Sequence, residues 1–318
     1  MKRILTGLVA ATLLASPTMA QDFPNQTLRM IVPWGAGGGT DVIARALAAG
    51  MEGPAGQTVI IDNITGAAGA TGSFQASQAR ADGYTMLLNG SSDLTAPMVF
   101  QDLPFDLDAF RYVGGVFVTP TWMVSPAERG YQTFDDLVAA ANANPNEVTV
   151  GVGGATNAHA LMAHAVRGYL NLPVRIINYQ GGADLNRALL ANEVHAGVIH
   201  SPVMLNETRE GLINVLVSGG SLEGITYEPL HGTPTLADVG MPFEIGVTRG
   251  IMVPAGTPDA VVERLAEIAR EATLSDGFAE FGARFGFAPV WLDGPEFEAV
   301  VRGELETFTG IFREFIAN

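Results

Sequence analysis

Four times along the chain, a short apolar run leads into a glycine-rich loop and then into a segment with helical periodicity. The apolar runs are residues 28–33, 58–62, 148–152 and 174–179. Strands that alternate with helices in this way pair in parallel and are covered by the helices that connect them. The sequence therefore predicts an α/β fold with mainly parallel sheets flanked by helices.

The length of 318 residues is about twice that of a common single domain, so we expect two lobes. Two stretches, near residues 113–125 and 245–254, are candidates for hinge crossings between them. On that division one lobe comprises residues 21–124 plus 246–318, and the other comprises residues 125–245. One lobe inserted into another through two crossings is the architecture of a hinged binding protein.

Residues 1–20 have the pattern of a secretory signal peptide. Lys2 and Arg3 form a basic start, residues 4–15 form an apolar run, and small residues end at Ala20. We expect cleavage after Ala20 and export of the mature chain to the periplasm; an uncleaved N-terminal anchor is the alternative. Because no later run reaches about 18 apolar residues, we expect no direct membrane insertion.

Residue types that many enzymes need are missing. The chain has no cysteine, and its single lysine is Lys2. This excludes thiol nucleophiles, cysteine-bound zinc, Schiff-base chemistry and the lysine of phosphate loops. His159 and His164, like His195 and His200, are five residues apart, which does not match a helical zinc pair. We therefore expect no enzyme, no cofactor and no metal ion. The histidines fit ordinary structural positions, and a ligand contact by His159 or His200 stays open.

The glycine-rich loops indicate a small anion as the ligand. Each loop places a helix N-terminus at the carboxyl edge of a sheet, where free N–H groups and the helix dipole attract negative charge. The segment Gly151–Thr156 lacks the third glycine of a dinucleotide fingerprint. With a formal net charge of −16, the chain is a poor partner for nucleic acid. We therefore expect a small organic carboxylate, although any one loop also fits a plain tight turn.

Several segments, in order along the chain, resemble the signatures of the Bug family, the periplasmic solute-binding proteins of tripartite tricarboxylate transporters. They are Ile31–Asp41, Asn63–Gly72, Ala81–Thr85, Asn178–Gly181, Thr233–Asp238 and Val253–Pro258. Two positions differ from the common pattern: Trp34 replaces a phenylalanine, and Ile64-Thr65 replaces arginine–proline. The resemblance implies a two-lobed periplasmic binding protein of type II, a Venus flytrap without chemistry of its own.

The resemblance also implies which residues bind the ligand. In the family, the loops after the first two strands hold one carboxylate and the second lobe closes on the rest. In the first lobe the matching residues are Trp34, Gly35, Ala36, Gly38, Thr40 and Asp41, followed by Gly66, Ala67, Gly69 and Thr71. Because a carboxylate repels a carboxylate, Asp41 is expected to cap its helix or fix the loop rather than touch the ligand.

In the second lobe the matching residues are Gly154, Asn157, Tyr179, Gly181 and Ala183. Arg249, near the return crossing, is a candidate for a second ligand carboxylate. Packing roles for Trp34 and Tyr179, and a pairing of Arg249 with a surface acid, are the alternatives.

The expected function is that of a periplasmic receptor for a di- or tricarboxylate or an aromatic acid. The resemblance implies that it delivers its ligand to the large and small membrane subunits of a tripartite transporter. We expect the protein to be a monomer. A carboxylate sensor for a signalling partner is an alternative, because the same closed lobes would serve it. A secreted α/β hydrolase is disfavoured, since the sequence shows neither a nucleophile motif nor a metal motif.

Overall fold

The computed structural model describes residues 23–200, 204–220 and 232–317, so the predicted signal peptide and its cleavage site lie outside the described residues. The strands are β1 (Leu28–Val32), β2 (Val59–Asn63), β3 (Thr85–Gly90), β4 (Phe110–Pro126), β5 (Thr149–Val152), β6 (Arg175–Asn178), β7 (Ala196–His200), β8 (Ile213–Ser218), β9 (Gly246–Pro254) and β10 (Ala288–Asp293). The helices are α1 (Gly39–Ala55), α2 (Ala70–Ser77), α3 (Ser91–Phe100), α4 (Phe134–Ala143), α5 (Ala158–Tyr169), α6 (Gly182–Leu190), α7 (Leu205–Arg209), α8 (Asp259–Thr273), α9 (Asp276–Phe285) and α10 (Gly294–Phe315).

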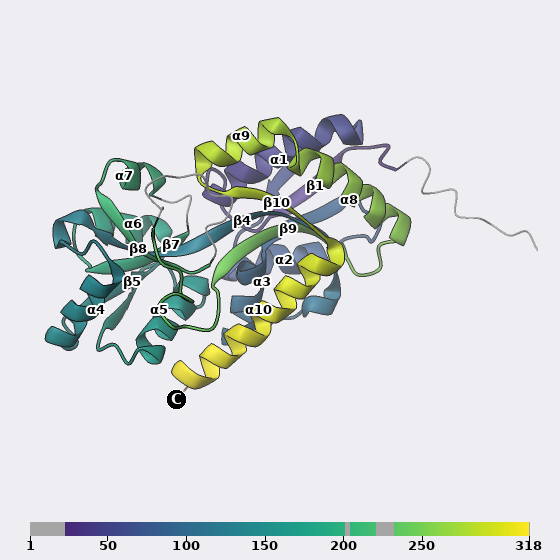
Figure 1. The fold of residues 1–318 in the computed structure, drawn as a ribbon. Helices are drawn as coiled ribbons and strands as arrows, with labels where there is room; N and C mark the ends of the chain where they lie inside the picture. Colours follow the sequence, from purple (N-terminus) through teal and green to yellow (C-terminus); the bar gives the residue numbers. More distant parts are fainter. Residues whose placement is uncertain (1–22, 201–203, 221–231, 318) are drawn as a thin grey trace, which may run out of the picture.

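The strands form two halves that share one long strand, β4. The strand order is β2-β1-β3-β9-β4-β7-β5-β6, with β8 and β10 also paired to β4. Figure 1 shows β4 running from the half that carries α1 and α8 into the half that carries α4 and α6. The return strand β9 pairs antiparallel with β4 from Phe110↔Pro254 to Pro120↔Gly246. The predicted two-lobed α/β fold is therefore confirmed.

The sheet is mixed rather than mainly parallel. Within the strand–loop–helix units the pairing is parallel, as predicted: β1 pairs with β2 and β3, and β5 pairs with β6 and β7. The strands that join the halves are antiparallel to their neighbours, because β4 leads out of the first half and β9 returns to it. The parallel pattern thus holds where a helix connects two strands, and it ends at the crossings.

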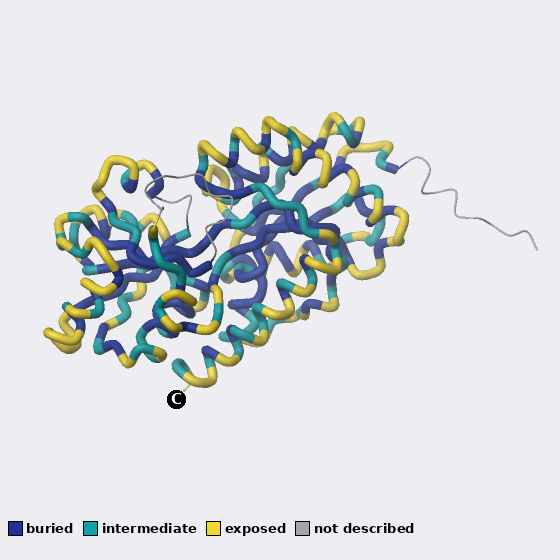
Figure 2. The backbone as a smooth tube through the Cα atoms, viewed as in Figure 1, coloured by how far each residue is buried: buried dark blue, intermediate teal, exposed yellow. Residues whose placement is uncertain are grey.

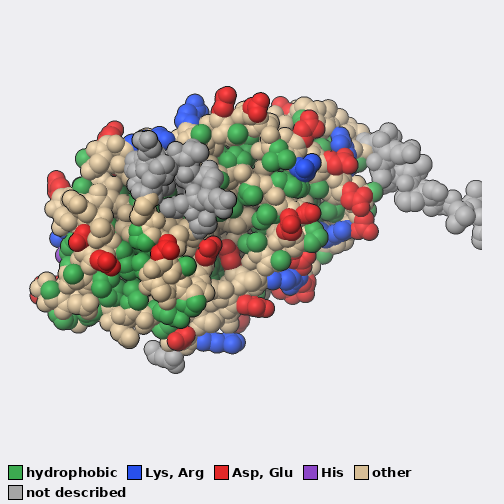
Figure 3. Space-filling view, viewed as in Figure 1, with side chains coloured by type: hydrophobic (Ala, Val, Ile, Leu, Met, Phe, Trp, Pro, Cys, Tyr) green, Lys and Arg blue, Asp and Glu red, His purple; other side chains and the backbone are tan. Residues whose placement is uncertain are grey.

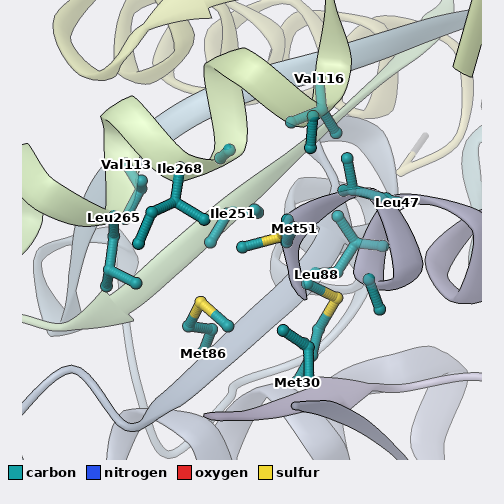
Figure 4. Close-up of a cluster of buried hydrophobic side chains, with 14 of the residues drawn as sticks. Met30, Leu47, Met51, Met86, Leu88, Val113, Val116, Ile251, Leu265 and Ile268 are labelled. Carbon is teal, nitrogen blue, oxygen red and sulfur yellow. The ribbon is translucent and has the colours of Figure 1, made fainter. Parts of the chain in front are cut away.

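Helices cover both faces of each half, so central strands such as β3 are buried on both faces. In β3, Met86 and Leu88 pack with α1 and α8, whereas Leu87 packs on the opposite face with α3 and α10. Figure 4 shows the first of these cores, where Met51 of α1 and Ile268 of α8 meet Met86 and Leu88. The tube in Figure 2 is buried along the central strands and exposed along the outer helices.

Helix α1 continues to Ala55. Met51 and Ala55, in its last turns, are buried against the core. Pro54 lies in the last turn, and Gly56 ends the helix in the left-handed conformation at φ 63°.

Helix α10 packs against both halves. Phe297 and Val301 belong to a core of the first half, and Gly250 makes room for the Phe297 ring, which lies 2.3 Å from where a Cβ would stand. Further along the helix, Phe308 and Ile311 belong to the same core as Leu161 of α5 in the second half. The C-terminal helix is therefore a contact between the halves in addition to β4 and β9 (Figure 1).

None of the helices among the described residues is long and apolar enough to cross a membrane. On the face shown in Figure 3, acidic and basic side chains are interspersed over both halves.

We expect Phe308→Ala to lower the free energy of unfolding by about 3–5 kcal/mol, because the fully buried ring leaves a cavity where α10 meets the second half. Denaturant unfolding followed by circular dichroism measures the loss. Phe74→Ala is the matched control, since Phe74 is 36% exposed and its truncation should cost much less. An equal loss in the free energy of unfolding for the two variants would show that the contact of Phe308 with the second half does not stabilise the protein.

Candidate functional site

The main candidate site is a cavity between the two halves, where the glycine-rich loops meet. Its volume is about 450 Å³. The first half contributes Trp34, Gly35, Ala36, Gly38, Gly39, Thr40, Ile43 and Asp93. The second half contributes Gly153, Asn157, His159, Gly182 and His200, and Arg249 of β9 completes the lining. Three helices, α1, α5 and α6, thus begin at one cavity.

The first loop, Gly35–Gly39, presents backbone to the cavity. Gly38 is the N-cap of α1 and has no side chain to cap the helix, so the first N–H groups of α1 lack intrahelical partners. A Cβ on Gly35 or Gly39 would meet no atom within 4 Å. The loop therefore leaves open space beside a helix N-terminus, which suits an anion.

Asp41 fixes this loop from behind. Its carboxylate accepts hydrogen bonds from the Gly37 amide (2.8 Å), Arg45 Nε (3.0 Å) and Asn63 Nδ2 (2.9 Å), and Asn63 Nδ2 also donates to the Trp34 carbonyl (2.9 Å). Burial alone would raise the pKa of Asp41, but the bonds from Arg45, Gly37 and Asn63 hold that pKa below its usual value. Asp41 is buried and does not cap α1. Of its two expected roles, the structure therefore supports the one of fixing the loop geometry.

The second loop, Gly66–Gly72, stands behind the cavity wall. The structure places none of Gly66, Ala67, Gly69 and Thr71 in the cavity lining. Gly69, at φ +92°, lies against the Trp34 indole, where a Cβ would come within 3.2 Å of the ring. Trp34 Nε1 in turn donates to Asn89 Oδ1 at 3.4 Å. This loop therefore packs behind the Trp34 side chain, which is part of the cavity lining.

The third loop, Gly153–Asn157, and the fourth, Gly181–Gly182, touch each other across the second half. A Cβ on Gly153 would lie 2.9 Å from the Gly182 nitrogen. Asn157 caps α5 by accepting from the Ala160 amide at 3.1 Å.

Of the residues predicted in these two loops, Asn157 lines the cavity, whereas Gly154, Gly181 and Ala183 do not. Their neighbours Gly153 and Gly182 line it instead, and the same glycine pattern could have indicated them. Tyr179 also lies outside the lining. It packs with Leu185 and Val194, as its packing alternative expects.

Arg249 is buried and already paired. Its Nη2 lies 3.1 Å from Asp93 Oδ2, its Nη1 donates to Thr119 Oγ1 at 2.7 Å, and the side chains of the ion pair are 7% and 8% exposed. The guanidinium also lies 5.7 Å from the Phe117 ring centroid. The structure supports the alternative in which Arg249 pairs with an acid, but this acid, Asp93, is buried and does not lie at the surface. Burial raises the pKa of Asp93, and the charge of Arg249 opposes that rise.

Two histidines meet in the cavity wall. The rings of His159, in the first turn of α5, and His200, at the end of β7, have centroids 4.2 Å apart. Burial, assisted by Arg249, lowers the pKa of His159 to about 4, and burial together with His159 lowers the pKa of His200. Sequence spacing contained no sign of this pair, because β7 and α5 are adjacent only in the fold. Within the described ranges, no group of three or more acidic or histidine side chains could hold a metal ion.

We expect Asp41→Asn to lower the free energy of unfolding by about 1–3 kcal/mol at neutral pH, because the amide cannot accept all the bonds that the carboxylate accepts. The native pKa of Asp41 is lowered, so its contribution is complete above the unfolded value of about 3.9 and is lost as the pH falls through the native value. The free energies of unfolding of the two proteins should therefore approach each other as the pH falls below about 3.9. The control is Asp62→Asn, since Asp62 forms a half-exposed ion pair with Arg29. This substitution should lower the free energy of unfolding by at most about 1 kcal/mol.

The sequence matches a family model and is similar to known proteins. A model of the family described as "Tripartite tricarboxylate transporter family receptor" matches residues 43–315. A UPF0065 protein of Bordetella pertussis is 32% identical over 292 residues, covering 91% of this chain and 88% of the relative. Protein BugT of the same organism is 30% identical over 331 residues, covering 99% of this chain and 98% of the relative.

Solved structures share the fold. The periplasmic binding protein BugD superposes with a TM-score of 0.78 at 25% identity, covering 92% of this chain and 98% of that chain. A Rhodopseudomonas palustris protein solved with adipate has a TM-score of 0.80 at 23% identity, with coverage of 92% and 98%. MatC of the same species, with bound malate, has a TM-score of 0.77 at 20% identity, with coverage of 91% and 99%. The family match over most of the chain, together with these relatives, places this chain in the Bug family of tripartite tricarboxylate transporter receptors.

Proposed function

We propose that the protein is a periplasmic receptor that captures a small organic carboxylate in the cavity between its halves. It binds the ligand unchanged and, as a monomer, delivers it to the membrane subunits of a tripartite transporter. The observation that carries the proposal is the convergence of the first, third and fourth loops, with their helix N-termini, on one cavity. The ligands of the adipate and malate complexes, which share this fold, are of the same chemical class.

Backbone donors supply the affinity for the first carboxylate. Hydrogen bonds to a charged group contribute about 1.5–3 kcal/mol each, and the first loop and the start of α1 offer several N–H groups beside open space. The net charge of −16 acts against an anion only at long range, where it is screened beyond about 8 Å at physiological salt. Local donors therefore outweigh the net charge.

The proposal includes a hinge. One lobe comprises residues 21–124 plus 246–318, the other comprises residues 125–245, and the crossings lie in β4 and β9. In favour of this hinge, the β4–β9 ladder has register shifts between Tyr112 and Gly114 and between Gly115 and Phe117. Such irregularities interrupt the ladder just before Thr119 and Pro120, which pair with β9 but with none of β10, β7 and β8.

We expect Gly35→Val to abolish carboxylate binding while the protein stays folded, because the new side chain enters the open space of the cavity. A thermal-shift screen against mono-, di- and tricarboxylates and aromatic acids measures the effect. A ligand at 100 times its Kd stabilises the wild type by about 2.7 kcal/mol, and the variant should show no shift.

The matched control is Gly277→Val, since Gly277 also has open space around it but lies in α9, away from the cavity. An unchanged shift in Gly35→Val would contradict the assignment of the ligand to this cavity. Chromatography of the ligand after incubation with stoichiometric protein tests turnover, and any product would contradict a pure receptor.

We expect ligand binding to bring the lobes together through bending of β4 and β9. Small-angle scattering should give a smaller radius of gyration with the stabilising carboxylate than without it. Equal radii at saturation would count against the hinge and leave a rigid binding protein.

A further inference from the structure

The wall of the cavity contains imidazole nitrogens without partners. Among the described residues, neither ring nitrogen of His159 and not Nδ1 of His200 has a hydrogen-bond partner, although these atoms are buried. Both rings line the cavity, and both belong to the second half. Because a buried polar atom left unpaired costs free energy, these atoms indicate a polar group of the ligand.

Among the described residues of the lining, no cation is left free for that group. Arg249 is the only basic side chain there besides the histidines, and Asp93 of α3 compensates its charge at 3.1 Å. Behind Asp93, burial raises the pKa of Glu304 of α10 to about 8, so this carboxyl is mostly protonated at neutral pH. The other residues that α1, α5 and α6 contribute to the lining are uncharged. A second ligand carboxylate would therefore enter a site with no net positive charge.

The histidine pair can supply the missing charge. Before a ligand binds, both imidazoles are neutral at pH 7, because burial and the charge of Arg249 lower the pKa of each, and His159 lowers the pKa of His200 further. A carboxylate placed beside the two rings raises their pKa, since an adjacent negative charge favours the imidazolium. Two imidazolium ions with ring centroids 4.2 Å apart would repel, so the pair holds one added proton.

We propose that His159 and His200 bind the second carboxylate of a dicarboxylate, and that the pair takes up one proton from the solvent when this ligand binds. A ring nitrogen accepts the proton from the buffer acid, and the resulting imidazolium donates to the carboxylate oxygen; no other bond changes. The inference rests on the proposed function and specifies its ligand as a dicarboxylate. Dicarboxylate affinity then rises as the pH falls, by up to tenfold per pH unit between the free and bound pKa values of the pair.

Isothermal titration calorimetry at pH 7 in phosphate and in Tris counts the protons, because the two buffers differ in ionisation enthalpy. The probes are two pairs matched in length: adipate with hexanoate, and succinate with butyrate. We expect proton uptake approaching one per dicarboxylate bound, and close to none for the monocarboxylates.

His159→Gln and His200→Gln should each remove most of the uptake and weaken dicarboxylate binding at least tenfold, with little effect on a monocarboxylate. His164→Gln is the matched control. His164 lies on the same helix and its pKa is also lowered to about 4, but it hydrogen-bonds Arg167 and does not line the cavity. This variant should behave as the wild type.

Dicarboxylate binding without proton uptake in the wild type would overturn the inference and leave the receptor function intact. Uptake that persists in both cavity variants would also overturn it, because the proton would then go to Asp93 and release Arg249. Failure of all four probes and of the wider carboxylate panel would remove the proposed function together with the inference.

Discussion

The antiparallel pairing of β4 with β9 is the constraint on which the rest of the structure depends. It places β3 beside β9 and β7 beside β4, so the parallel strands of both halves are ordered outward from one central pair. The loops at the carboxyl ends of β1, β5 and β6 consequently face a common space, where helices α1, α5 and α6 begin. A cavity rich in backbone donors follows from the topology and needs few specialised side chains.

The sequence predicted the parts of the fold that are encoded locally. Each strand–loop–helix unit appears at its predicted place, because an apolar run, a glycine loop and helical periodicity lie within about thirty residues of one another. The course of α10 was not predictable in this way. Its apolar face indicates a buried helix, but nothing near Phe297 or Phe308 says that one will meet the first half and the other the second.

The candidate site shows a second limit on what can be predicted from the sequence. Glycine serves two purposes that look alike in a sequence. At Gly66 and Gly69 it permits φ values of +132° and +92° and close packing, whereas at Gly35 it leaves space open to a cavity. The partner of Arg249 was equally hidden, since Asp93 lies 156 residues earlier in the chain. Motifs identified the loops, but only the fold separates supporting residues from lining residues.

The electrostatics of the cavity follow from what surrounds Arg249. A guanidinium as deeply buried as that of Arg249 is stable only with a partner, and Asp93 is that partner. Because Asp93 neutralises the positive charge of Arg249, this charge is not available to bind an anion. The cavity can therefore be neutral before a ligand enters, which avoids the cost of an uncompensated buried cation in the free protein. In our proposal, the charge for a second carboxylate comes from a group that changes its protonation state. Among the lining residues that the structure describes, and outside the ion pair, only His159 and His200 have side chains that an adjacent carboxylate can bring to titrate near neutral pH.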